Sequence, residues 1–166
     1  MHVMNNYQIP YFKEQETVDP DESFEEYASE TFFPDYLYEM LHRTQVSGMN
    51  KKRFIRSSLN PDFHFEIRNE PGKHFWVECK YLEIDQMHEA IRILDNNLLH
   101  RFKTFENSFL FLCVKIQREE YYFFVPFNQI KSAELYFSFL NSYIVSVDPP
   151  ISTELIGKYL RTWKIY

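Results

Sequence analysis

Two strand-like segments joined by a turn place the strongest constraint on how this chain can fold. Residues 62–68 and 74–81 both alternate between apolar and polar side chains, so each predicts a strand with one apolar face. The apolar positions are Phe63, Phe65, Ile67, Phe75, Val77 and Cys79. Residues 69–73 (Asn-Glu-Pro-Gly-Lys) are typical of a tight turn. The sequence therefore predicts a β-hairpin.

The register of this hairpin decides which polar residues share a face. Glu78 and Lys80 are two apart on one strand, so they point the same way, roughly 7 Å apart. A turn centred on Pro71 places Asp62 opposite Lys80. It also places His64 opposite Glu78. Any turn with an odd number of residues keeps Asp62, Glu78 and Lys80 on one face, whereas an even number separates them.

Two carboxylates and an amine on one face suit metal-dependent chemistry on a phosphodiester. Mg²⁺ prefers oxygen ligands, polarises a phosphoryl oxygen and makes its bound water more acidic. Lys80 can orient or activate that water, or stabilise charge that develops on the phosphate. Simpler interpretations stay open, because Asp62 can cap a strand and Glu78 with Lys80 can form a surface ion pair. A carboxylate inside the largely apolar segment 75–80 (Phe-Trp-Val-Glu-Cys-Lys) is nevertheless costly unless it is paired or metal-bound.

A helix is predicted before the hairpin, with Asp19 as its N-cap and Pro20 at its first position. Its apolar stripe consists of Phe24, Tyr27, Ala28, Thr31 and Phe32. Glu25 borders this stripe, whereas Glu26 points almost the opposite way. Pro34 is expected to end the helix.

The rest of the chain predicts further elements, in sequence order. They are a short helix over 35–42, a short strand over 53–56, a helix over about 85–105, strands over 109–116 and 121–125, a helix near 129–140, a strand near 143–147 and a helix near 152–160. The strand over 109–116 is almost wholly apolar, which places it at the centre of the sheet. This order predicts an α/β (α+β) fold with a central mixed sheet flanked by helices. Residues 1–18 are interpreted as an N-terminal arm or tail, and residues 19–166 as a single domain.

Pro61-Asp62 followed by Val77-Glu78-Cys79-Lys80 resembles the motif of the PD-(D/E)XK nuclease superfamily, which includes restriction endonucleases and Holliday-junction resolvases. Asp62 and Glu78 lie 16 residues apart across one turn, as the hairpin of that family requires. The resemblance covers about residues 20–130 and implies a restriction-endonuclease-like core.

The resemblance also implies a function and a set of site residues. In the family, a Glu on the preceding helix often completes the metal site, and Glu25 matches it. Phe24-Glu25 is also similar to the "FE" of related uncharacterised nuclease-like proteins. The implied activity is hydrolysis of a phosphodiester by a metal-activated water. Asp62, Glu78 and Glu25 would hold Mg²⁺ or Mn²⁺, and Lys80 would complete the catalytic set.

The expected substrate is a nucleic acid, with DNA as the favoured class. Arg101 and Lys103 on the following predicted helix are candidate phosphate contacts, with plain solvation as the alternative. The net charge of −6 opposes nucleic-acid binding, unless charge is segregated. A basic face is one interpretation of residues 42–56, which hold His42, Arg43, Lys51, Lys52, Arg53 and Arg56. A homodimer is expected, since cutting both strands with one active site per chain often needs two chains.

Several features bear on the compartment. No apolar run approaches the 18 residues of a membrane helix, and residues 1–10 lack the pattern of a secretory signal. Cys79 and Cys113 each lie in an apolar run, so we interpret them as buried free thiols of a cytoplasmic protein.

A second hypothesis is a catalytically inactive module that keeps the nuclease fold and binds a protein or nucleic-acid partner. The acidic balance and the aromatic content favour it. Its candidate partner surface consists of Tyr136, Phe137, Phe139 and Tyr143.

Overall fold

The computed structural model describes residues 20–44, 60–83, 90–92, 99–100, 102–103, 109–117, 121–145 and 149–162. The strands are β1 (Tyr38–Arg43), β2 (Phe63–Ile67), β3 (His74–Leu82), β4 (Ala90–Arg92), β5 (Leu110–Ile116), β6 (Tyr122–Pro126), β7 (Glu134–Tyr136) and β8 (Ile144–Val145). The helical segments are α2 (Pro20–Tyr27), the π-helical η2 (Ala28–Phe32), η6 (Phe127–Gln129), α4 (Phe137–Leu140), η7 (Asn141–Tyr143) and α5 (Thr153–Thr162). Within these residues, no helix is long and apolar enough to cross a lipid bilayer.

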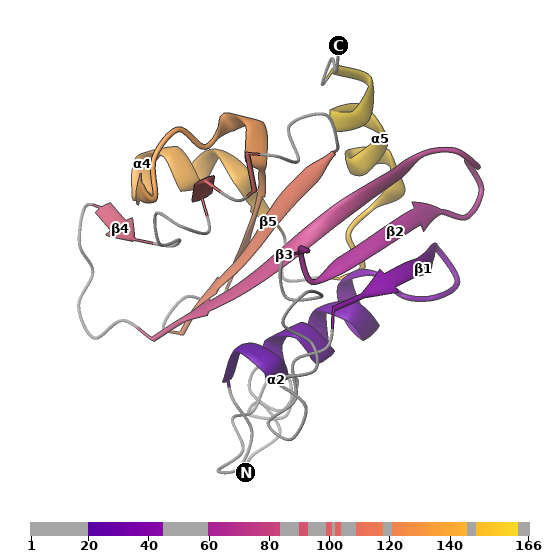
Figure 1. The fold of residues 1–166 in the computed structure, drawn as a ribbon, viewed down its shortest axis with the longest axis horizontal. Helices are drawn as coiled ribbons and strands as arrows, with labels where there is room; N and C mark the ends of the chain where they lie inside the picture. The colour runs from indigo at the N-terminus through magenta and orange to yellow at the C-terminus, as the bar shows by residue number, and fades with distance from the viewer. Residues whose placement is uncertain are drawn as a thin grey trace, which may run out of the picture.

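The described strands form a mixed sheet, as the sequence predicts. Its order is β1-β2-β3-β5-β6-β8, and β4 and β7 form a separate two-stranded sheet. β3 and β5 run parallel, whereas every other pair of neighbouring strands in this sheet runs antiparallel (Figure 1). The apolar strand β5 lies inside the sheet, where it was expected. The predicted fold class, a mixed sheet flanked by helices, is confirmed.

The predicted hairpin consists of β2 and β3. Phe63 pairs with Val77, so the turn centres on Glu70 rather than on Pro71. Gly72 in this turn has a φ of +92°, which a residue without a side chain adopts without strain. The turn that contains Pro71 therefore closes one residue earlier along the chain than the sequence suggested.

This shift changes the partners across the hairpin but keeps the shared face. His64 pairs with Trp76 instead of Glu78. Continued past the last pair, the same register brings Asp62 opposite Glu78 rather than Lys80. The pairing moves by two positions, which is one full period of a strand, so the parity of the turn is preserved.

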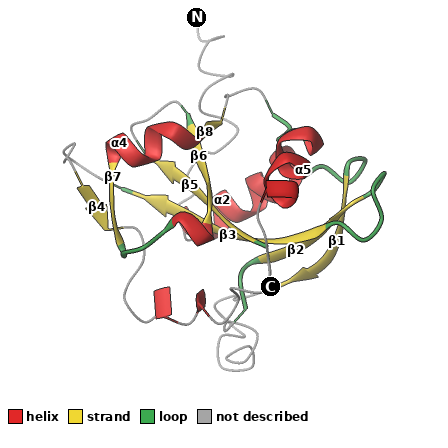
Figure 2. Ribbon diagram, turned by 90° about the horizontal axis from the view of Figure 1, so that it is seen from above, coloured by secondary structure: helices red, strands yellow, loops and turns green. Residues whose placement is uncertain are grey.

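Two apolar clusters lie on opposite faces of the sheet. The first packs α2, η2 and α5 against the apolar face of the hairpin and the adjoining side of β5 and β6 (Figure 2). The second covers the other side of β5 and β6 with side chains from residues 127–140, together with Leu99 and Phe102. Phe24 of α2 belongs to the first cluster and stacks on Tyr122, with ring centroids 5.9 Å apart. Helix α2 is thereby fixed beside β3.

The prediction of a helix over residues 35–42 is wrong, because Tyr38–Arg43 forms the strand β1. Pro34 does end the preceding helix, and the chain then pairs with β2 instead of restarting a helix. Tyr38 is buried, and its hydroxyl donates a hydrogen bond of 2.7 Å to the carbonyl of Ile151. Long-range pairing thus overrides the local helical pattern.

The helices predicted over 85–105 and 129–140 are wrong over part of their length. Ala90–Arg92 and Glu134–Tyr136 pair with each other as β4 and β7, and only Phe137–Leu140 is helical at the end of the second range. Residues 99, 100 and 102 are helical, as expected. The strand at Ile144–Val145 and the helix at Thr153–Thr162 are confirmed.

Other predictions concern the cysteines and the segments outside the described residues. Cys79 and Cys113 are free and buried, as predicted, and the structure also places them directly opposite each other on β3 and β5. The arm over residues 1–18, the N-cap Asp19 and the strand over 53–56 lie outside the described residues. The division into an arm and a single domain stays a prediction.

Phe111 tests the packing that fixes the sheet. It is fully buried, it stacks on Phe124 at 4.5 Å, and its ring also contacts Phe75. We expect Phe111→Ala to lower the free energy of unfolding by about 3–5 kcal/mol, because it leaves a cavity that the neighbouring rings cannot fill. Urea denaturation followed by circular dichroism measures the change.

The matched control is Tyr136→Ala, since 53% of Tyr136 is exposed. It should cost no more than about 0.5 kcal/mol. Equal losses from the two variants would contradict the packing described for β5.

Candidate active site

The candidate site lies where β2 separates from β3. Their last paired residues are Phe63 and Val77, and beyond that point a side chain replaces the backbone of β2. The N–H of Cys79 donates to Oδ2 of Asp62 at 2.8 Å. In return, the N–H of Asp62 donates to Oε1 of Glu78 at 3.2 Å. These reciprocal hydrogen bonds hold the two acids together at the margin of the sheet.

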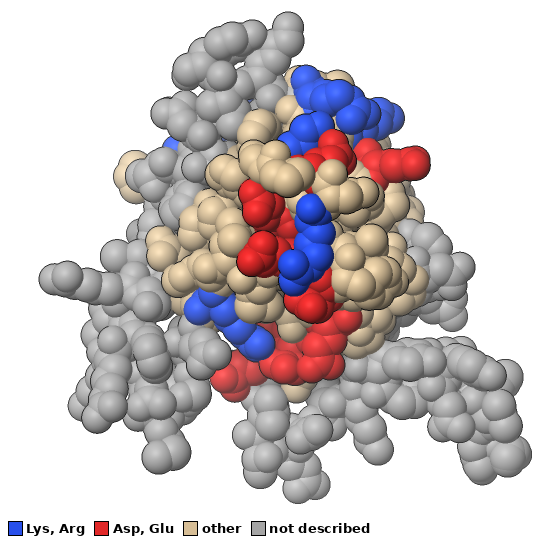
Figure 3. Space-filling model, turned by 90° about the vertical axis from the view of Figure 1, so that its right-hand side faces the viewer, with Lys and Arg blue, Asp and Glu red and all other residues tan. Residues whose placement is uncertain are grey.

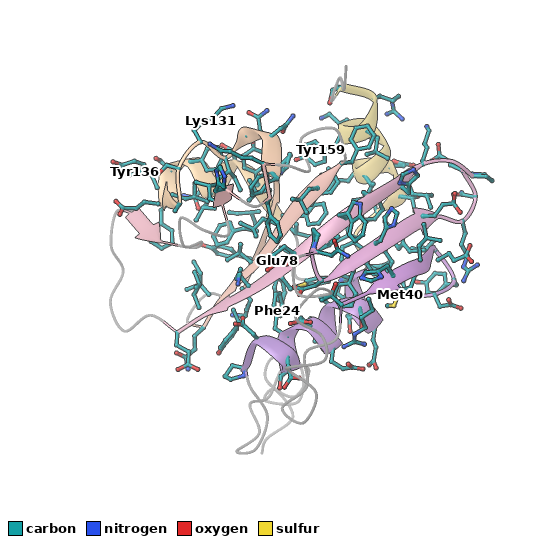
Figure 4. All side chains as sticks on the ribbon, in the orientation of Figure 1. Phe24, Met40, Glu78, Lys131, Tyr136 and Tyr159 are labelled. Carbon is teal, nitrogen blue, oxygen red and sulfur yellow. The ribbon has the colours of Figure 1, made fainter. Side chains whose placement is uncertain are left out.

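Lys80 joins the two acids from the same face of β3. Its Nζ lies 3.6 Å from Oε2 of Glu78. The Lys80 side chain is 24% exposed and that of Glu78 only 9%, so this is not the exposed ion pair considered as an alternative. Glu78 lies midway along β3 (Figure 4). The structure thus brings Asp62, Glu78 and Lys80 together on one side of the hairpin.

The two adjacent acids of α2 separate as helix geometry predicts. Glu26 points outward, and its Oε2 accepts a 2.7 Å hydrogen bond from Arg43. Glu25 faces the other way, and it interacts electrostatically with Asp62 and Glu78. Burial raises the pKa of Glu25 to about 9, with the charge of Asp62 adding to the rise. Of the two candidates, only Glu25 belongs to the cluster.

The acids of this cluster resist ionisation because they are buried together. Burial raises the pKa of Asp62 to about 6, although the N–H of Cys79 and the charge of Lys80 oppose the rise. Burial and then the charge of Asp62 raise the pKa of Glu78. The charge of Glu25 adds to the rise in the pKa of Glu78, so the three carboxyl groups disfavour one another's ionisation. The cluster therefore favours protonated carboxyl groups, whose place a cation could take by neutralising the same charge.

Lys80 experiences opposing influences, as the sequence suggested. Burial lowers its pKa, but the charges of Glu78, Asp21 and Asp62 outweigh that effect and raise it overall. Lys80 is therefore a positive charge in this cluster, suited to neutralising developing negative charge rather than to accepting a proton.

Asp21 is a site residue that the sequence analysis missed. Its Oδ1 accepts a 2.8 Å hydrogen bond from the N–H of Tyr81, two residues past Cys79. Its charge also contributes to the pKa shifts of Glu25 and Asp62. The signal was present, because positions four apart on a helix share a face, which places Asp21 beside Glu25.

Of the two predicted substrate contacts, only Lys103 lies within the described residues, where it is exposed. Arg101 lies outside them, so both stay predictions. Of the predicted basic face, only His42 and Arg43 are described, and Arg43 is engaged by Glu26. On the face shown in Figure 3, basic and acidic side chains are interspersed and form no single basic patch among the described residues.

The donor set fits a hard divalent cation. Asp62, Glu78 and Glu25 offer oxygen atoms only, which are the ligands that Mg²⁺ and Mn²⁺ prefer. As arranged, no three acidic, histidine or cysteine side chains in the described segments are close enough to form a complete metal site. Asp62 and Glu78 form a preorganised pair, and Glu25 would have to move closer to act as a third ligand.

Comparison with known proteins gives similarity to solved structures but no match in sequence. No family model matches the chain, and no curated protein sequence matches it. A similar solved structure is that of Hjc, a Holliday junction resolvase from the archaeal hyperthermophile Archaeoglobus fulgidus. The identity is 14% and the TM-score 0.47, over 74% of this chain and 87% of that chain. The chemistry is therefore inferred from the site's own residues.

The crowding of acids predicts that Glu25→Gln stabilises the metal-free protein. Between pH 4.5 and about 9 the unfolded chain has released the Glu25 proton that the folded chain still holds, so the wild type loses stability as the pH rises. A glutamine removes this loss. We expect a gain of about 1 kcal/mol at pH 8 that shrinks toward pH 5, measured by urea denaturation with a chelator present.

Glu26→Gln is the matched control on the same helix. The charge and hydrogen bond of Arg43 lower the pKa of Glu26, so this substitution should slightly destabilise the protein. A Glu25→Gln variant that is no more stable than wild type at pH 8 would argue against the buried cluster.

Proposed function

We propose that this chain is a metal-dependent nuclease that hydrolyses phosphodiester bonds. The observation that supports this proposal is the reciprocal hydrogen bonding between Asp62 and the Glu78-Cys79 segment, with Lys80 beside it. A buried group of acids with one cation is an expensive arrangement for stability alone. The free energy lost by burying these charged groups is explained if the acids bind a metal ion and the lysine contacts a phosphate.

The proposed metal ligands are Asp62, Glu78 and Glu25, with Mg²⁺ or Mn²⁺ as the cofactor. Bound there, the ion would supply Lewis-acid polarisation of the phosphate and a more acidic water. Asp62 and Glu78 provide the fixed pair of carboxylates, because backbone N–H groups orient one oxygen of each. Glu25 would approach from α2 as the third ligand, and on metal binding it would release to solvent the proton that burial favours on it.

Lys80 is proposed to act on the phosphate. Its Nζ is positively charged and lies at the Glu78 carboxylate. From this position it neutralises negative charge that develops on the phosphate oxygens in the transition state. The alternative role, accepting a proton from water, is disfavoured because the surrounding acids raise its pKa.

DNA is the proposed substrate, and a homodimer is the proposed assembly for cutting both strands. The acidic net charge of −6 implies that binding depends on local contacts, for which Arg101 and Lys103 remain candidates. The reducing cytoplasm is the proposed compartment, supported by two buried cysteines that are free.

Glu78→Ala should abolish Mg²⁺-dependent cleavage of DNA. We expect a loss of at least about 10²-fold in cleavage rate, because one of the two fixed carboxylates is removed. The assay incubates duplexes, flaps and four-way junctions with Mg²⁺ or Mn²⁺ and follows product on gels. Glu39→Ala, which removes an exposed strand carboxylate, is the matched control and should cut at the wild-type rate.

Lys80→Met and Asp62→Asn should separate chemistry from metal binding. Lys80→Met removes the amine but keeps all carboxylates, so it should bind Mn²⁺ in calorimetry and cut at least about 10²-fold more slowly. Asp62→Asn should lose Mn²⁺ binding altogether. Cleavage by Lys80→Met at the wild-type rate would refute the role proposed for the lysine.

The second candidate function is an inactive module that binds a protein or nucleic-acid partner. It is favoured by the lack of a complete three-ligand metal site among the described residues. Its expected aromatic surface is less open than predicted, since Phe137, Phe139 and Tyr143 pack on the second cluster and Tyr136 alone of the four is exposed. Failure of the wild type to bind Mn²⁺ at millimolar concentration would favour this function over the enzyme.

A further inference from the structure

We propose that Asp21 is a positioning residue for the site, fastening α2 to the free margin of β3 and so setting where Glu25 stands. The inference deepens the proposed nuclease function and rests on it for its catalytic consequence. Its structural core, the link between Asp21 and β3, rests on geometry alone.

The margin of β3 beyond β2 is held by side chains instead of a strand. The N–H groups of Val77, Cys79 and Tyr81 all point to this side, because alternate residues of a strand share a hydrogen-bonding direction. β2 ends opposite Val77, so the next two N–H groups need other acceptors. Asp62 accepts from Cys79 and Asp21 accepts from Tyr81, each at 2.8 Å.

The two acceptors come from different parts of the chain. Asp62 reaches β3 from the end of β2, whereas Asp21 reaches it from the first turn of α2, 60 residues away in sequence from Tyr81. The bond therefore ties the start of a helix to the strand that carries Glu78 and Lys80. A simple helix-dipole role for Asp21 needs no partner on β3, and the bond to Tyr81 goes beyond it.

The bond also fixes the rotation of α2. Asp21 and Glu25 are four residues apart and project from one side of the helix. Phe24, between them, packs on Tyr81 and Tyr122, with ring centroids 6.5 and 5.9 Å apart. With the helix anchored at these two points, Glu25 is directed toward Asp62 and Glu78. To these ring contacts, and to the Arg43–Glu26 ion pair, Asp21 adds a bond that ties the first turn of the helix directly to β3.

The test compares Asp21→Ala with Asp21→Asn. Alanine removes the acceptor, whereas asparagine keeps an Oδ1 that can accept from Tyr81. In the metal-free protein, amide exchange of Tyr81 should be at least about tenfold faster in Asp21→Ala and close to wild type in Asp21→Asn. Glu83→Gln, which removes an exposed carboxylate just past β3, is the control and should leave the exchange rate unchanged.

A second measurement asks whether Asp21 acts through Glu25. Glu25→Gln should raise the unfolding temperature of the wild type but not of Asp21→Ala, because an unanchored helix lets Glu25 leave the cluster. In the loaded enzyme, Asp21→Ala should lower Mn²⁺ affinity and kcat about 10- to 100-fold with little change in KM, and Asp21→Asn should restore most of both.

The outcomes separate the inference from the proposed function. Unchanged Tyr81 exchange in Asp21→Ala, or an equal effect of Glu25→Gln in both backgrounds, overturns the positioning role. If the wild type neither binds Mn²⁺ nor cuts DNA, the nuclease proposal fails, while the exchange and unfolding measurements still decide the role of Asp21. Cutting by the wild type with full activity in Asp21→Ala refutes the inference and leaves the nuclease intact.

Discussion

The separation of β2 from β3 beyond their last pair, Phe63 with Val77, is the constraint on which the site depends. A strand that loses its neighbour exposes backbone N–H groups, and buried groups of this kind need acceptors. Here carboxylates supply them, so the same side chains that complete the sheet also concentrate negative charge at its margin. The same feature, the end of the hydrogen-bond ladder between β2 and β3, therefore places the acids of the candidate site.

The charge gathered there is balanced only in part. Lys80 lies at the Glu78 carboxylate, and Arg43 lowers the pKa of Glu25 although its hydrogen bond goes to Glu26. The remaining imbalance is expressed as protons retained on buried carboxyl groups. A cation entering such a cluster exchanges with protons, so metal affinity and acidity of the medium should oppose each other.

The sequence predicted features that depend on a local period and failed where distant segments decide. The alternation of apolar and polar residues over β2 and β3 was enough to predict that Asp62, Glu78 and Lys80 share one face. The observed register differs from the predicted one by two positions, and such a shift leaves every side chain on its original face. Helical rotation likewise separated Glu25 from Glu26. By contrast, the local pattern of Tyr38–Arg43 predicts a helix, but the segment forms a strand because it pairs with β2. Ala90–Arg92 likewise forms a strand because it pairs with residues 134–136.

Asp21 could have been predicted from its spacing from Glu25, but its role as an acceptor depends on where β2 ends.

The hydrogen bond of Asp62 has a consequence for the evolution of such proteins. A relative without the proposed activity would still need Asp62 to satisfy the N–H of Cys79, so an acid there is weak evidence of activity. Among the described contacts, Lys80 makes no hydrogen bond to a backbone group and pairs with the Glu78 carboxylate instead. Its replacement in a relative would therefore be the earlier and clearer sign of an enzyme turned into a scaffold.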